Sequence, residues 1–131
     1  MVVLQLAHAG ILAPTTLTHR EAVGPSSLES RTGATVREMT ENDIDAVIDA
    51  FAQAARRAEE AGFDGVQIHA AHGFLLSQFL SPHFNVRSDR YGGTTRNRAQ
   101  IVLDILKHIK AVLSHGFPVL IKMNSEDFLD D

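Results

Sequence analysis

The 131-residue sequence contains no cysteine, which excludes disulfides, thiolate nucleophiles and cysteine-ligated metals within this segment. It also lacks a basic excess: 16 acidic residues against 12 lysines and arginines give a formal net charge of −4, so nucleic acid is not an expected partner. No apolar run approaches the roughly 18 residues of a membrane-spanning helix, and no charged stretch precedes the short apolar run at the N-terminus. These absences lead us to expect a soluble, cytoplasmic protein without a membrane partner.

What the sequence does contain is an alternation of short apolar runs and longer amphipathic stretches. Apolar residues make up 44% of the chain, enough for one domain or part of one. The pattern predicts buried strands and long helices in alternation, the strands at residues 2–7, 66–68 and 119–121 and the helices from Thr40 to Gly62 and from residue 94 or 95 to residue 114. Such alternation is typical of right-handed βαβ units with a parallel sheet, either doubly wound or closed into a barrel. The Gly-x-Gly-x-x-Gly fingerprint after the first strand is absent, which weighs against the doubly wound nucleotide-binding fold.

Local signals define the first helix more closely than the rest. Thr40 precedes three acidic or amide residues and forms a loose capping box with Asp43, while Gly62 suits the left-handed turn that ends a helix. Residues 10–39 are rich in Gly, Pro, Ser and Thr, so we expect a long surface excursion and assign no firm element there.

Each predicted strand carries a polar residue at or near its C-terminal end: Gln5, His69 and Lys122. Taken singly, each residue has a structural interpretation, as a glutamine paired with a backbone group, a satisfied histidine or a lysine that reaches the rim. Because ligands of parallel α/β folds bind at the C-terminal edge, the three residues together indicate a site.

His69 and His72 form a His-x-x-His pair that could also supply two metal ligands. No cysteine is available, and Asp64 and Asp89 do not stand at an obvious ligand spacing. A metal-dependent α/β hydrolase is therefore the less favoured alternative.

Two long motifs carry a resemblance to a known family. IHAAHGFLLSQFLSP at residues 68–82 and NVRSDRYGGTTRNRA at residues 85–99 resemble the Old Yellow Enzyme family of flavin-dependent ene-reductases and NADH:flavin oxidoreductases. The similarity extends to QLAHAG at residues 5–10 and IKMNSEDF at residues 121–128. It implies a (β/α)₈ TIM barrel, which usually needs about 250 residues. We therefore expect residues 1–131 to be the central segment of a single FMN-binding TIM-barrel domain, covering about strands 3 to 5.

The resemblance also implies roles for the strand-end residues. FMN would be the cofactor, NADH or NADPH the reductant, and a small-molecule enone, quinone or oxygen the acceptor. Gln5 would read the pyrimidine edge of the flavin, and Lys122 would place a positive charge near flavin N1 and O2, favouring the reduced cofactor. His69, counted in both the cofactor and the catalytic set, would act with His72 to grip the substrate oxygen on which charge develops.

Phe74 is the departure from the family pattern, because it stands where ene-reductases carry a tyrosine that donates a proton. Since a general acid contributes about 10²–10⁴-fold, Phe74 favours acceptors that need no such acid, such as quinones or oxygen. Asn85, Arg87, Asp89 and Tyr91 are interpreted as structural residues that tie the site loop together. The alternative within the same family is a non-catalytic truncated fragment; the isolated segment is expected to be inactive, and a homo-oligomer is compatible with this interpretation.

Overall fold

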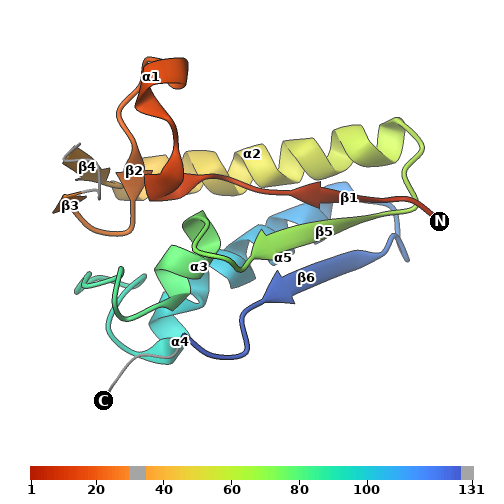
Figure 1. Cartoon of the computed structure of the whole chain (residues 1–131). Helices are drawn as coiled ribbons and strands as arrows, with labels where there is room; N and C mark the ends of the chain where they lie inside the picture. Colours follow the sequence, from red (N-terminus) through yellow and green to blue (C-terminus); the bar gives the residue numbers. More distant parts are fainter. Residues whose placement is uncertain (30–34, 128–131) are drawn as a thin grey trace.

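A three-stranded parallel sheet forms the centre of the computed structural model, which describes residues 1–29 and 35–127. The strands are β1 (Val3–Leu6), β5 (Gly65–Ala70) and β6 (Val119–Met123), in the order β1-β5-β6 (Figure 1). Val3 pairs with Gly65, and Val66 pairs with Val119, both in parallel register. The predicted strand, helix, strand, helix, strand order with parallel pairing is confirmed.

Helix α2 (Glu41–Glu60) lies between β1 and β5 in the chain. The N-terminal cap predicted for this helix is confirmed. The Thr40 hydroxyl accepts a hydrogen bond from the Asp43 backbone N–H at 3.2 Å, and the Asp43 carboxylate accepts one from the Thr40 backbone N–H at 2.8 Å. This reciprocal pair satisfies two donors that an uncapped helix would leave open. At the other end, Gly62 has a φ of 86°, the left-handed conformation predicted for it.

The second helical stretch differs from the prediction, which placed one continuous helix up to residue 114. The structure divides it into α4 (Thr95–Arg98) and α5 (Gln100–Val112). At Ala99 the chain tightens, and the Val102 N–H bonds to the Ala99 carbonyl three residues back at 3.1 Å. A one-residue interruption of this kind leaves the apolar stripe nearly in phase, so hydrophobic periodicity did not reveal it.

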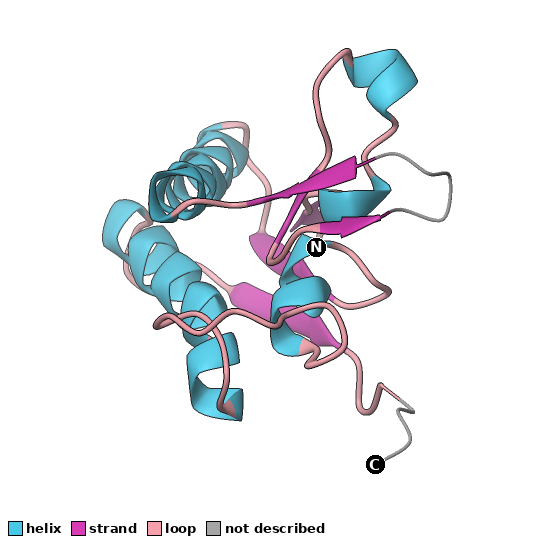
Figure 2. Ribbon diagram, turned by 90° about the vertical axis from the view of Figure 1, so that its left-hand side faces the viewer, coloured by secondary structure: helices cyan, strands magenta, loops and turns pink. Residues whose placement is uncertain are grey.

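The two long helices lie side by side on one face of the sheet, as Figure 2 shows. That face presents alternate strand residues, among them Leu6, Val66 and Ile68, each at most 7% exposed. They pack with the buried stripes of α2 and α5, which comprise Ile44, Ile48, Phe51, Ala52, Ala55, Ala58, Ile101, Val102, Ile105 and Ile109. Burying one such aliphatic side chain contributes about 1.5–3 kcal/mol, so this layer of contacts fixes which face of the sheet remains for a ligand.

The excursion between β1 and α2 contains several short elements that the sequence did not reveal. They are a 3₁₀ turn η1 (Gly10–Leu12), helix α1 (Thr15–Thr18) and a second small sheet of β2 (Val23–Gly24), β3 (Leu28–Glu29) and β4 (Thr35–Glu38), with β4 in the middle. Residues 30–34 of the predicted excursion lie outside the described residues. Strands of two to four residues are too short to show a period of two, so pairing across the excursion determines them.

Helix α3 (Leu75–Leu80) replaces what the sequence suggested to be only a compact apolar turn at Phe74, Leu75 and Leu76. Leu75, Leu76 and Phe79 are at most 1% exposed, and the chain ends the helix before Pro82. Six residues are too few for helical periodicity to be recognised, but tertiary burial of one apolar side is enough to stabilise them.

The loop of residues 85–91 is tied down as predicted, through the buried residues Asn85, Arg87 and Tyr91, while Val86, Ser88 and Arg90 between them are exposed. The Asn85 side-chain amide donates to the Phe79 and Tyr91 carbonyls at 2.7 and 2.8 Å. Arg87 is 8% exposed and forms an ion pair with Asp89. Because Arg87 is buried, its interactions should contribute more to stability than those of a fully exposed ion pair.

None of the helices in the part of the chain described, residues 1–29 and 35–127, is both long and apolar enough to span a membrane.

Candidate active site at the C-terminal ends of the strands

The sheet face turned away from α2 and α5 carries the polar strand residues. His69 of β5 pairs in register with Lys122 of β6, and Gln5 of β1 pairs with Gln67 of β5. Because paired residues in a parallel sheet project to the same face and residues two apart share a face, all four belong to one side. The predicted convergence on one face is therefore present.

Gln5 lies one layer below His69 and Lys122, since its register partner is Gln67 rather than His69. The Gln5 amide N–H donates to Gln67 Oε1 at 2.7 Å. Gln67 is a polar site residue that the sequence analysis missed. The alternation of side chains along a strand could have found it, because it stands two residues before His69.

His69, His72 and Phe74 form an aromatic cluster where β5 ends. The imidazole centroids of His69 and His72 are 5.1 Å apart with their planes at 77°, and the His69 centroid is 4.9 Å from that of Phe74. His69 is 5% exposed, whereas His72 is exposed. One histidine of the pair is thus enclosed by its surroundings, and the other is open to solvent.

His69 Nδ1 is the polar atom that most directly indicates a ligand. Within residues 1–29 and 35–127 it is a buried side-chain nitrogen without a hydrogen-bond partner. An unpaired buried polar group costs about 1–3 kcal/mol, so its presence needs a reason such as a partner supplied by a ligand.

Burial lowers the pKa of His69 below its usual value, and the charges of His72 and Lys122 lower it further. The imidazole is therefore neutral near pH 7 and offers one donor and one acceptor nitrogen. Lys122, the register partner of His69, thus places a positive charge close to this imidazole.

The loop after β1 contacts the same region. The His8 Nδ1 atom accepts a hydrogen bond from the Gly10 backbone N–H at 3.1 Å, and burial lowers the His8 pKa. Buried Gln78 of α3 donates to the Gly73 carbonyl at 2.5 Å, and its Oε1 accepts from the Ile11 N–H at 3.2 Å. Gln78 thereby ties the loop after β1 to the turn after β5, a role the sequence did not show.

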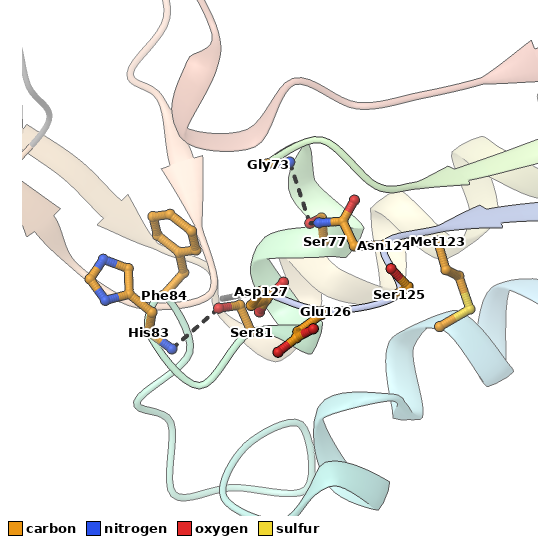
Figure 3. A pocket seen from close by; sticks show the side chains of 10 residues that line it. All are labelled: Gly73, Ser77, Ser81, His83, Phe84, Met123, Asn124, Ser125, Glu126 and Asp127. Atoms are coloured by element: carbon orange, nitrogen blue, oxygen red, sulfur yellow. Dashed lines mark hydrogen bonds between the residues drawn. The ribbon is translucent and has the colours of Figure 1, made fainter. Parts of the chain in front are cut away.

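A cavity of about 630 Å³ opens beside this turn, between α3 and the segment after β6 (Figure 3). Gly73, Ser77 and Ser81 line one side of it, and residues 124–127 line another. Figure 3 shows the Asn124 side chain beside Ser77. The cavity is large enough for a small organic molecule.

Across residues 1–29 and 35–127, no three His, Asp or Glu side chains come together in a way that could hold a metal ion. The structure of these residues therefore offers no support for the alternative of a metal-dependent enzyme. Asp64, one of the carboxylates considered above, instead pairs with the N-terminal amine at 3.7 Å, at the opposite end of β5.

Parallel strands covered by helices on one face, with polar side chains near their C-terminal ends on the other, are the arrangement of part of a (β/α)₈ barrel. Comparison with known proteins agrees. A solved structure of an old yellow enzyme homologue from Zymomonas mobilis superposes with a TM-score of 0.84 at 30% identity, over 93% of this chain and 37% of that one. Morphinone reductase in complex with tetrahydroNAD gives a TM-score of 0.83 at 32% identity, over 92% of this chain and 38% of that one.

The chain belongs to the NADH:flavin oxidoreductase / NADH oxidase family, whose sequence pattern it matches over residues 1–131. Among characterised relatives, an NADPH dehydrogenase from Clostridium acetobutylicum is 41% identical over 128 residues, which is 97% of this chain and 37% of that protein. The chain thus spans little more than a third of this relative. The predicted family and the partial-barrel fold are confirmed, while the assignment to strands 3 to 5 stays a prediction.

Proposed function

We propose that residues 1–131 are the central segment of a single FMN-binding domain, in a protein that passes electrons from NADH or NADPH to a small-molecule acceptor. The observation that carries this proposal is the pair His69 and His72, whose rings lie 5.1 Å apart where β5 ends. The unpaired, buried Nδ1 of His69 points to a ligand that completes it. The names of the family and of the relatives support the redox chemistry.

FMN, when bound, supplies the hydride chemistry that no side chain of this segment provides. In our proposal Lys122 and Gln5 contact the flavin, because they share the ligand-facing side of the sheet with His69. The Gln5 amide can donate and accept at once, which suits a heterocyclic edge of alternating polarity. The Lys122 ammonium contributes a fixed positive charge that would favour a cofactor carrying negative charge.

His69 and His72 bind the oxygen atom of the acceptor in this proposal. Two donors held in fixed positions stabilise an oxygen most when it gains negative charge during the reaction, since they need not reorganise at that moment. His69 is held by burial and His72 by its turn, so the pair meets the requirement for fixed donors.

Phe74 determines which acceptors we favour. Its ring lies 4.9 Å from the centroid of His69, and a phenyl group has no proton to donate. Acceptors that require protonation at carbon, such as enones, would need water or another side chain as the acid. We therefore propose a quinone or oxygen as a better acceptor than an enone, in keeping with the NADH oxidase branch named by the family.

The test is a titration of the purified, FMN-loaded full-length protein that contains this segment. A para-substituted phenol is added, and the long-wavelength charge-transfer absorbance is followed. His69→Ala with His72→Ala should abolish the band while FMN remains bound. His115→Ala is the matched control, because His115 is exposed beside the turn at Gly116 and should leave the band unchanged. A band of wild-type affinity in the double variant would refute the proposed role, and a protein that binds no flavin would favour the non-catalytic alternative.

The cytoplasmic location and the homo-oligomer stay predictions, as do small molecules as the sole class of partner.

A further inference from the structure

The turn that carries His72 has an unusual backbone. His72 has a φ of 60° and the following Gly73 has a φ of 74°, so two consecutive residues adopt the left-handed region. Glycine does so without steric cost, but a non-glycine residue there is uncommon and strained. Such a conformation persists where neighbouring groups over-determine it. The residues that hold this turn therefore control where the His72 imidazole lies.

Two polar side chains accept hydrogen bonds from the N–H groups of this turn, and one of them comes from the segment directly after β6. The Asn124 Oδ1 atom accepts a hydrogen bond from the His72 backbone N–H at 3.1 Å. Ser77 Oγ accepts from the Gly73 N–H at 3.3 Å and from Asn124 Nδ2 at 3.4 Å, linking the asparagine to α3. Asn124 and Ser77 face each other in Figure 3. From 52 residues away in the sequence, the asparagine thus bonds directly to the strained residue.

We infer that Asn124 is a positioning residue, which fixes the left-handed His72 so that its imidazole meets the acceptor oxygen together with His69. The inference rests on the proposed function. The end of β6 and the residue after it then serve the same site: Lys122 pairs in register with His69, and Asn124, directly after the strand, holds His72. The exposed setting of Asn124 makes its substitution compatible with an intact core.

The first test uses Asn124→Ala in the FMN-loaded protein. Loss of one hydrogen bond corresponds to roughly a threefold to tenfold change in an equilibrium constant, so phenol affinity should fall by that factor. FMN affinity and the flavin midpoint potential should not change, because Lys122 is retained. Asn42→Ala is the matched control: this asparagine is exposed in the first turn of α2 and does not line the cavity, so phenol affinity should stay at the wild-type value.

The second test is hydrogen exchange of the peptide that contains His72 and Gly73, which reports on the turn without any ligand. Asn124→Ala should speed this exchange, whereas Asn124→Asp retains a side-chain oxygen as acceptor and should keep the peptide protected.

Faster exchange with phenol affinity within twofold of wild type would overturn the positioning role, as would an equal loss of affinity in Asn42→Ala. Wild-type protein that binds FMN but no phenol would instead refute the proposed function of the histidine pair, and this inference with it.

Discussion

Replacing Arg87 with methionine should destabilise the protein more than any other single removal of a positive charge in this segment. The Arg87 side chain is 5% exposed, whereas Asp89 and Glu38, its ion-pair partners, are 32% and 49% exposed. Arg87 Nη1 also donates to the Pro25 and Met39 carbonyls at 2.8 and 2.6 Å. It thus joins the site loop to the excursion and to the residue before the cap of α2.

The size of this destabilisation depends on which partners of Arg87 can be solvated by water once the arginine is removed. Asp89 and Glu38 are solvated well enough to tolerate the loss, but the two carbonyl bonds are buried. Hydrogen bonds from a charged donor contribute about 1.5–3 kcal/mol each, so two of them amount to about 3–6 kcal/mol. The free energy of unfolding should therefore fall by about 3–6 kcal/mol.

Urea unfolding followed by far-ultraviolet circular dichroism would measure this loss, with Arg56→Met as the matched control. Arg56 makes one ion pair with Glu60 at 2.7 Å, four residues away on α2, with both side chains more than half exposed. The same substitution there should cost about 0.5 kcal/mol or less. An Arg87→Met variant within about 1 kcal/mol of wild type, or no less stable than the control, would refute the argument from burial.

Three further predictions concern the site and the scaffold. Phe74→Tyr should raise enone turnover by up to about 10²-fold for a well-placed acid, while reduction of the flavin by NAD(P)H is unchanged. Stopped-flow measurement of the two half-reactions would show this difference. No gain in enone turnover would mean that the proton has another source. Lys122→Met should lower the flavin midpoint potential or weaken FMN binding, and an unchanged potential in spectroelectrochemistry would remove Lys122 from the cofactor site. Hydrogen bonds from Arg37 and Thr40 hold the pKa of Asp43 well below its usual range. The ionised carboxylate therefore stabilises the fold above the ordinary aspartate pKa of about 3.9, and this stabilisation is lost as the pH falls below that value. Acid unfolding of Asp43→Asn should show a weaker pH dependence than that of the wild type.

The parts of the fold that the sequence predicted are those set by local and periodic signals. The cap at Thr40 and the left-handed Gly62 need only neighbouring residues, and the apolar stripe of α2 repeats over 20 residues. The parts it did not predict depend on distant partners. Helix α3 has six residues, and β2 exists because it pairs with β4 across the excursion. The elements that the sequence predicted are long or locally capped, whereas the elements that it did not predict have only two to six residues.

The candidate site divides in a similar way. Gln5, His69 and Lys122 could be placed on one face because parallel strands bring their C-terminal ends together. The one-layer offset of Gln5 and the presence of Gln67 depend on the register, which the sequence alone did not specify. The resemblance to a known family suggested the histidine pair and Phe74, but not what holds them.

The hydrogen bonds that hold the turn after β5 also limit which residues around the site can be substituted. The turn at Gly73 is bonded on its N–H side by Ser77, and on its carbonyl side by Gln78, which reaches back to the loop after β1. Because these polar groups are buried or nearly so, replacing any one leaves a partner without a hydrogen bond at a cost of about 1–3 kcal/mol. The histidine pair is therefore coupled through α3 to both neighbouring strands, and a change of acceptor specificity is least disruptive at Phe74, whose ring faces the site at the head of α3 without a polar partner to lose.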